Sequence, residues 1–170
     1  MNIEIRTAQL GDLTALAELG KQTFREHFSQ YWHDTDVFLN KDFSLPVLQH
    51  VLAEPNKHRY LLAFIEDILV GFAKVNFLSL EPCRECVGLE LQKIYLTKES
   101  VGHHIGSALF EQIISLAHES NSSCIWLNVL EVNEKARAFY TKFGFEQTAE
   151  FPFQTDKCLL NMLVMQRNLI

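Results

Sequence analysis

The chain has 170 residues, of which 48% are hydrophobic and 21% are charged. This composition is that of a globular domain and excludes a disordered chain or a fibrous repeat. The length is typical of one domain, and we expect that domain to cover residues 1–170 and to be large enough to build a core that does not depend on disulfide staples. Acidic residues outnumber basic ones by 21 to 15, and the resulting net charge of −6 disfavours nucleic acid as a partner.

The sequence carries no sign of a membrane or secretory segment. The most apolar run, residues 60–80, is interrupted by charged side chains such as Glu66 and Asp67, and is no candidate for a membrane span. Residues 2–7 alternate like a strand, unlike a signal peptide. The 4 cysteines are too few for a disulfide scaffold in a chain of this length. We therefore expect a cytoplasmic protein with no membrane partner.

Hydrophobic periodicity and turn residues predict the elements in chain order. They are a strand over 2–7, a helix capped by Asp12 and reaching about residue 28, a loop or broken helix at 31–36, a helix over 44–55, a hairpin of 60–65 and 69–78, a connection over 80–88, a strand over 89–96, a Gly/His loop at 102–106, a helix over 107–119, a strand over 124–130, a helix over 133–143, and strands over 145–153 and 159–165.

This order predicts one α/β domain of mixed α+β character. Residues 89–130 form a strand–loop–helix–strand unit, so their two strands should be parallel with a right-handed crossover. The hairpins favour antiparallel neighbours elsewhere. We expect a twisted, mixed, mostly antiparallel sheet of six to seven strands, with about four helices on its faces.

The strand over 89–96 leads into a compact loop, Val101–Gly106, that opens a helix. Successive backbone N–H groups at the positive end of a helix dipole are suited to a phosphate group. Gly102 and Gly106 would let the backbone approach such an anion closely. The alternative is a tight turn that uses glycine only for its dihedral angles.

A second stretch, residues 133–145, predicts a helix capped by Asn133 and stopped by Gly144. One face of this helix carries Ala136, Phe139, Tyr140 and Phe143. On periodicity alone this is a packing face, with the Tyr140 hydroxyl satisfied by a backbone carbonyl.

In this order and spacing, the two stretches resemble the GCN5-related N-acetyltransferase (GNAT) family. The family's loop pattern, Gln/Arg-x-x-Gly-x-Gly/Ala, falls without gaps on Val101–Gly106, and the helix signature matches Asn133…Phe139-Tyr140…Phe143-Gly144-Phe145. The element order from Asn2 to Met165 matches too, so the resemblance covers nearly the whole chain. Residues 90–96, 125–127 and 131–133 look most like the branch that includes bacterial polyamine acetyltransferases.

The sequence departs from the family's loop pattern at two positions. Val101 stands where the family usually has Gln or Arg, and it offers phosphate no side-chain contact. His104 replaces the middle glycine and adds bulk where the backbone must come close. A protonated His103 or His104 could instead help to neutralise a pyrophosphate, the alternative being a solvated pair of loop histidines.

The resemblance implies acetyl-CoA as cosubstrate and no metal. Backbone N–H groups of the loop would hold the pyrophosphate, and the strand edge would pair with the pantetheine arm. The implied cofactor-binding residues are Ile94, Tyr95, Leu96, Gly102, His103, His104, Ile105, Gly106, Ser107 and Asn133. Asn133 would contact the arm or orient its helix.

The resemblance also implies catalytic roles. Tyr140 would lie near the sulfur and protonate the departing thiolate, while a backbone N–H of residues 91–94 would stabilise the oxyanion. Glu90 is the best candidate for the general base, acting through water. The alternative for Glu90 is a carboxylate at the solvent-exposed rim.

Three further features carry less specific signals. Asp34 and Asp36, beside Tyr31 and Trp32, could hold an ammonium group by charge and cation–π contact, or the stretch could be surface packing. Residues 151–153 are candidates for a second wall of the acceptor site or for the edge of a homodimer. The CxxC at 83–86 has no second pair for zinc and no thioredoxin-like context.

The leading hypothesis is an acetyl-CoA-dependent N-acetyltransferase in which a small-molecule or terminal primary amine attacks directly in a ternary complex. The alternative is a CoA-binding or regulatory module that has the fold but no turnover. A structural interaction domain is a third reading, which predicts no CoA binding. Polyamines, amino acids, peptide N-termini and aminoglycosides all stay open as acceptors.

Overall fold

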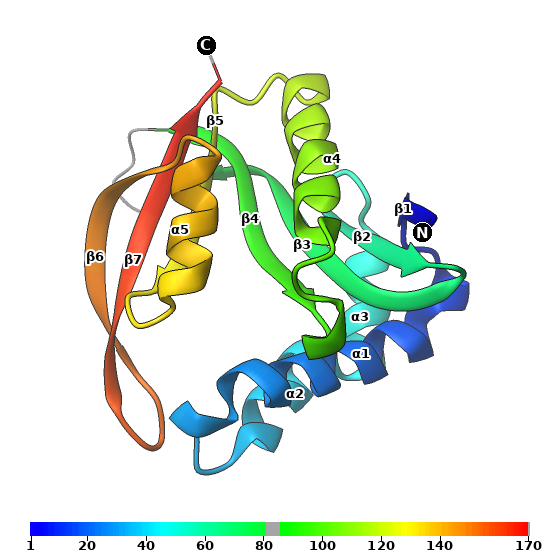
Figure 1. The fold of residues 1–170 in the computed structure, drawn as a ribbon, viewed down its shortest axis with the longest axis horizontal. Helices are drawn as coiled ribbons and strands as arrows, with labels where there is room; N and C mark the ends of the chain where they lie inside the picture. The colour runs from blue at the N-terminus through cyan, green and yellow to red at the C-terminus, as the bar shows by residue number, and fades with distance from the viewer. Residues whose placement is uncertain (81–85, 170) are drawn as a thin grey trace.

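The computed structural model describes residues 1–80 and 86–169 (Figure 1). Over these residues one sheet of seven strands runs in the order β1-β2-β3-β4-β5-β7-β6. Its strands are β1 Ile3–Thr7, β2 His58–Ile65, β3 Ile68–Leu80, β4 Val87–Leu96, β5 Cys124–Leu130, β6 Glu146–Gln154 and β7 Leu159–Asn168. Every neighbouring pair is antiparallel except β4 and β5, which are parallel. The predicted fold class and the predicted parallel pair are both confirmed.

The described residues form five α-helices: α1 Leu13–Phe28, α2 Thr35–Phe43, α3 Leu45–Leu52, α4 Ile105–Glu119 and α5 Glu134–Lys142. Short 3-10 turns lie at Leu10–Asp12, Ser29–Tyr31 and Lys98–Ser100. The helix α2 exceeds the expected four. It begins where the Asp34 carboxylate accepts a hydrogen bond from the Asp36 N–H, and it buries Leu39 and Phe43. Two buried positions are too few to give a helical period that can be read from the sequence.

The helices cover both faces of the sheet. Side chains of α4 and α5 pack with one face, and side chains of α1, α2 and α3 pack with the other. Asp12 stands at the N-cap position of α1, as predicted, but its side chain does not cap the helix. The carboxylate instead pairs with Arg6 at 2.8 Å and accepts a hydrogen bond from the Gln9 N–H. That pair joins the start of α1 to β1.

The parallel strands β4 and β5 pair over only two positions, Leu89 with Ile125 and Glu90 with Trp126. Beyond Glu90 the two strands diverge, and the sheet is split there (Figure 1). We call the space between them the β4–β5 gap. Because the Thr97 N–H donates to β3, alternation along the strand turns the backbone groups of Ile94 and Leu96 away from β3 and toward this gap.

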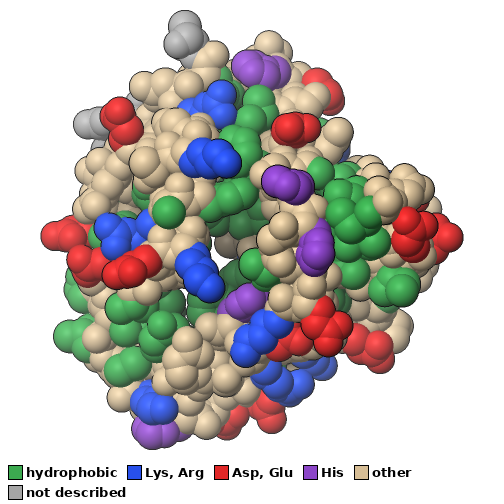
Figure 2. Space-filling view, viewed as in Figure 1, with side chains coloured by type: hydrophobic (Ala, Val, Ile, Leu, Met, Phe, Trp, Pro, Cys, Tyr) green, Lys and Arg blue, Asp and Glu red, His purple; other side chains and the backbone are tan. Residues whose placement is uncertain are grey.

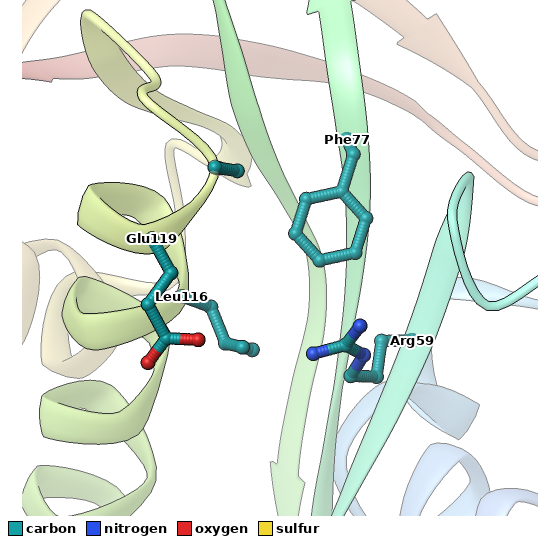
Figure 3. Close-up of a pocket in the computed structure, with 5 residues that line it drawn as sticks. Arg59, Phe77, Leu116 and Glu119 are labelled. Carbon is teal, nitrogen blue, oxygen red and sulfur yellow. The ribbon is translucent and has the colours of Figure 1, made fainter.

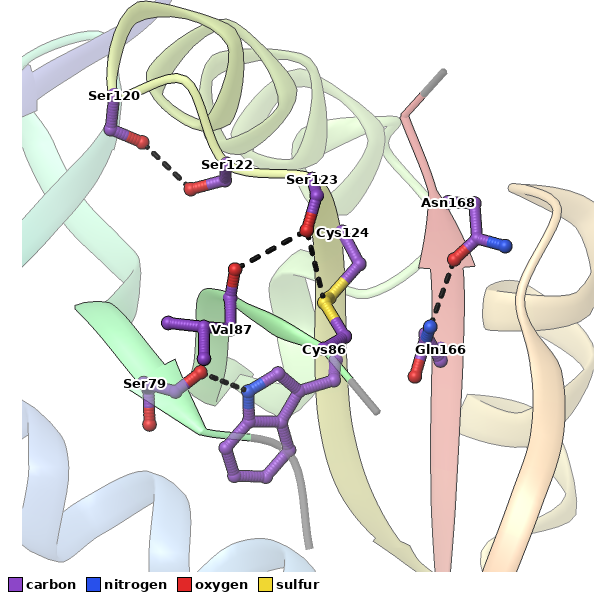
Figure 4. The surroundings of a disulfide bond; sticks show 10 residues. Ser79, Cys86, Val87, Ser120, Ser122, Ser123, Cys124, Gln166 and Asn168 are labelled. Atoms are coloured by element: carbon purple, nitrogen blue, oxygen red, sulfur yellow. Dashed lines mark hydrogen bonds between the residues drawn. A yellow bond between two sulfur atoms is a disulfide. The ribbon is translucent and has the colours of Figure 1, made fainter. Parts of the chain in front are cut away.

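A disulfide between Cys86 and Cys124 joins the two strands at the closed end of the gap (Figure 4). This pairing was not predicted from the sequence. Cys86 and Cys124 lie 38 residues apart in sequence, and only the parallel register brings them together. Cys83, the other cysteine of the CxxC, lies outside the described residues. The Trp126 indole N–H donates to the Ser79 carbonyl at 3.2 Å beside this disulfide.

Gly20 of α1 lies against the ring of Phe43, which is fully buried and contacts Phe72 edge to face. A Cβ at Gly20 would overlap that ring. We therefore expect Gly20→Ala to lower the free energy of unfolding by about 1–3 kcal/mol, despite the better helix propensity of alanine. Urea unfolding measures this change. Gly11→Ala, where nothing lies within 4 Å of the added methyl, is the matched control. Equal stabilities of the two variants would contradict the prediction.

Candidate active site

The loop before α4 ends in a run of free backbone donors. Gly102 has φ of 90° and His104 has φ of 61°, and α4 begins at Ile105, two residues earlier than expected from the sequence. The first bond of the helix runs from the Ala108 N–H to the His104 carbonyl at 3.0 Å. Within the described residues, no acceptor contacts the N–H groups of residues 105–107. A helix N-terminus with three free amides is suited to an anion.

The two glycines of this loop differ in their surroundings. Gly102 supplies the left-handed conformation of the turn, and a Cβ there would meet nothing within 4 Å. A Cβ on Gly106 would lie 3.6 Å from the Phe139 ring and 3.9 Å from Leu96, which are ordinary van der Waals distances. The close approach of an anion at Gly106 stays a prediction.

Of the three strand residues assigned to the cofactor, two face the β4–β5 gap. Ile94 and Leu96 turn their backbone groups to it, as predicted. Tyr95 bonds its backbone to β3 and packs its ring edge-on against Phe28 and Phe72. The Leu96 carbonyl also contacts the His27 Nε2 of α1 at 2.7 Å. No pattern in the sequence indicated His27, because the contact joins residues 69 positions apart.

Tyr140 lies on the buried face of α5, with 7% of its surface exposed. Its ring packs against Phe139 and Phe145. Burial raises the pKa of the Tyr140 phenol, and the nearby Tyr95 raises it further, so the hydroxyl stays protonated at neutral pH. No acceptor among the described residues takes a hydrogen bond from this hydroxyl. Tyr140 can therefore donate a proton to a bound molecule.

Asn133 serves as the N-cap of α5, as predicted. Its side-chain oxygen accepts a hydrogen bond from the Ala136 N–H at 3.2 Å. At the other end of the helix, Gly144 has φ of 84° and stops it. Asn133 therefore orients the helix that carries Tyr140.

Glu90 is part of a polar row that crosses three strands. Asn76 pairs directly with Glu90 on β4 and with His58 on β2. The Glu90 carboxylate accepts hydrogen bonds from the Asn76 amide at 2.8 Å and from the Ser79 hydroxyl at 3.4 Å. The side-chain oxygen of Asn76 accepts a hydrogen bond from His58 Nδ1 at 2.7 Å. The sequence analysis missed His58 and Asn76, which only the strand register brings to Glu90.

A second row, Tyr60–Lys74–Lys93, lies beside the first. Lys93 is buried and pairs with Asp42 at 2.6 Å. The Lys74 ammonium donates to the Gln92 side-chain oxygen at 2.6 Å. Burial and the neighbouring Lys93 lower the pKa of Lys74 to about 8. The β3–β4 register shifts at Gln92, so a bulge separates the two rows.

The two segments predicted to line the acceptor site, the stretch around Trp32 and residues 151–153, contact one another. Trp32, in the link between α1 and α2, contacts the ring of Phe153 on β6. The Thr155 hydroxyl donates to the Tyr31 carbonyl at 2.6 Å. The Asp156 carboxylate accepts from the backbone N–H groups of residues 33 and 34 at 2.7 and 2.9 Å, and these bonds lower its pKa. The turn between β6 and β7 is thus bound to the α1–α2 link.

The two carboxylates predicted to hold an ammonium group both have partners. Asp34 caps α2, and Asp36 pairs with Arg25 at 3.0 Å. Arg25 and Asp36 are both well exposed, so their ion pair lies at the surface of the protein. The structure therefore gives this placement of the ammonium group no support.

The surface is hollowed at the centre of the face shown in Figure 2, with basic and histidine side chains on the rim. A separate pocket of about 210 Å³ lies between β2, β3 and the end of α4 (Figure 3). It is lined by Arg59, Phe77, Leu116, Glu119 and Ser120. None of the predicted site residues lines that pocket.

No three His, Cys, Asp and Glu side chains of the described residues are grouped as ligands for a metal ion. Among these residues, no helix has the length and apolar character to cross a membrane.

The chain is similar to acetyltransferases in sequence and in fold. The model of the acetyltransferase (GNAT) family matches residues 14–145. An uncharacterized N-acetyltransferase in the pepI 3′ region of Lactobacillus delbrueckii subsp. lactis is 30% identical over 164 residues, which are 90% of this chain and 93% of that protein. PaiA N-acetyltransferase from Thermoplasma acidophilum, solved in complex with coenzyme A, has a TM-score of 0.81 at 20% identity, covering 99% of each chain. A ribosomal-protein-alanine N-acetyltransferase from Brucella melitensis has a TM-score of 0.77 at 23% identity, covering 98% of this chain and 99% of that one.

These matches define the class of protein as an acyltransferase. The chain belongs to the acetyltransferase (GNAT) family, as its two motifs indicated. The branch of bacterial polyamine acetyltransferases stays a prediction, because the names of these relatives specify no polyamine.

His104 holds a left-handed conformation that costs a side chain roughly 1–2 kcal/mol relative to glycine. We expect His104→Gly to raise the free energy of unfolding by about 1 kcal/mol, measured by urea unfolding. His103→Gly, at a position without positive φ, should be neutral or slightly destabilising. A loss of stability in His104→Gly would show that the imidazole makes a contact worth more than the relieved strain.

Proposed function

We propose that this chain is an acetyl-CoA-dependent N-acetyltransferase that acts on a small-molecule or terminal primary amine in a ternary complex. The observation that carries the proposal is the β4–β5 gap, with free strand-edge groups on one side and three free amides at the start of α4. The similarity in fold to a PaiA structure in complex with coenzyme A supports it.

The residues present fit the cosubstrate. The amides of residues 105–107 suit a pyrophosphate, and the edge of Ile94 and Leu96 suits the amide groups of a pantetheine arm. His27 would share the Leu96 carbonyl with that arm. When bound, acetyl-CoA supplies a thioester, whose acyl group an amine can accept directly.

The two catalytic candidates approach the gap from opposite faces of the sheet. Glu90 belongs to the polar rows on the face that α1–α3 cover, whereas Tyr140 belongs to the core between the sheet and α4 and α5. Glu90, held by Asn76 and Ser79, takes the proton of the ammonium group through water. The neutral amine would then form a C–N bond as the C–S bond breaks, with Tyr140 giving its proton to the sulfur. The acylated nitrogen would lose its extra proton through water to the Tyr140 phenolate, which restores the hydroxyl.

The direct test measures thiol release from acetyl-CoA in the presence of a panel of primary amines, with calorimetry of CoA binding alongside. Transfer to at least one amine supports the proposal. CoA binding without transfer to any acceptor would indicate a binding or regulatory module. If CoA does not bind, the chain is a structural interaction domain that has the family fold.

Tyr140→Phe removes only the hydroxyl and keeps the ring in its buried contacts. We expect turnover at saturating acetyl-CoA to fall by about 10²-fold, near the low end for loss of a general acid, because a thiolate is already a fair leaving group. Acetyl-CoA affinity and melting temperature should change little. Turnover within about threefold of wild type, with chemistry rate-limiting, would reduce Tyr140 to a packing residue.

Glu90→Gln keeps the shape of the side chain and removes its basicity. If Glu90 is the general base, turnover near neutral pH should fall by about 10²–10⁴-fold. Glu146→Gln, an exposed position on β6, serves as the matched control and should leave turnover unchanged. A Glu90→Gln enzyme that matches this control would place Glu90 at the solvent rim, as the alternative reading holds.

A further inference from the structure

Two opposite charges lie near one another on the face of the sheet covered by α1–α3, without pairing. Each is held by a neutral group: Lys74 by the Gln92 side-chain oxygen, and Glu90 by Asn76 and Ser79. Among the described residues, neither Lys74 nor Glu90 forms a salt bridge. Both side chains are only half-buried, so solvent or a ligand reaches them.

The neighbouring lysine behaves differently. Lys93 is 93% buried and is neutralised by Asp42 at 2.6 Å. A lysine paired in this way is a structural element of the core. Lys74 makes one hydrogen bond through an ammonium group that carries three donors, which leaves two donors for another molecule.

The strand register fixes the spacing of the unpaired charges. Glu90 lies opposite Asn76, two residues along β3 from Lys74, and the bulge at Gln92 adds one residue to β4 between the two rows. Diagonal neighbours of a regular antiparallel pair have Cα atoms roughly 7–8 Å apart, and the bulge changes this spacing locally. A ligand that bridges the two groups must therefore be short and must carry a positive and a negative charge a few bonds apart.

We propose that the acceptor is an α-amino acid, whose carboxylate binds Lys74 while its amine faces Glu90. This inference rests on the proposed function and names the substrate class of the same site. A polyamine suits the surroundings of Glu90 less well, since its second ammonium group would meet the unpaired positive charge of Lys74. The carboxylate of the acceptor also satisfies the donors of Lys74 that are left open.

The test compares three matched acceptors at pH 7 with acetyl-CoA: an α-amino acid, its α-carboxamide and the amine formed by its decarboxylation. The wild-type enzyme should prefer the amino acid by at least tenfold in kcat/KM. Lys74→Met should remove that preference. Its kcat/KM for the amino acid should fall at least tenfold, while kcat/KM for the carboxamide and for the decarboxylated amine should change little. Lys57→Met, an exposed lysine paired with Glu54, is the matched control and should keep the wild-type pattern.

The wild-type panel needs no variant, so a Lys74→Met chain that fails to fold does not weaken the test. Equal or better transfer to the carboxamide or to the decarboxylated amine overturns the proposal, as does a Lys74→Met enzyme that keeps the preference. If no acceptor reacts, the proposed function fails. The inference about the amino acid is then tested separately, by calorimetry of amino acid binding to the wild-type chain in the presence of CoA. Binding that Lys74→Met weakens at least tenfold supports it, and absence of binding overturns it.

Discussion

The incomplete pairing of β4 with β5 is the constraint on which the site depends. Two residue pairs and one disulfide hold the strands together at one end, and the strands then diverge. Backbone groups inside a sheet normally satisfy one another, so an open strand edge within the sheet needs another partner. Ile94 and Leu96 present such an edge, and the first turn of α4 adds three more donors at its far end. Tyr140 comes from the α4–α5 side of the sheet, and Tyr95, which packs on the other side, still raises the pKa of the Tyr140 phenol.

The side chains around the opening are organised by register across the sheet. His58, Asn76 and Glu90 are successive partners on three strands, and Tyr60, Lys74 and Lys93 form the adjacent row. The first row holds the proposed base by hydrogen bonds from neutral groups. The second carries two lysines, of which Asp42 neutralises only one. The bulge at Gln92 lies between the rows and supplies the amide that holds Lys74. Within this small area, residues on β3 matter as much as those on β4.

Local signals in the sequence predicted the parts of the site that lie within one element. Asn133 capping its helix, the buried face with Tyr140 and the turn at Gly102 each depend on neighbours a few residues away. The parts that sequence reasoning missed depend on distant pairing. Asn76 meets Glu90 only through the β3–β4 register, His27 reaches Leu96 across 69 positions, and Cys86 meets Cys124 through a parallel pair. A pattern with period 2 gives the face of each strand but not its register against its neighbour.

The contacts around the opening close a ring of protein. The Leu96 carbonyl of β4 contacts His27 of α1. The α1–α2 link in turn binds the β6–β7 turn through Thr155 and Asp156. The ring is completed by β7, which pairs with β5. Four hydrogen bonds and the contact between the Trp32 and Phe153 rings close the ring at the β6–β7 turn. The hydrogen bonds of Thr155 and Asp156 thus connect the strands on the two sides of the gap to one another through the helical layer.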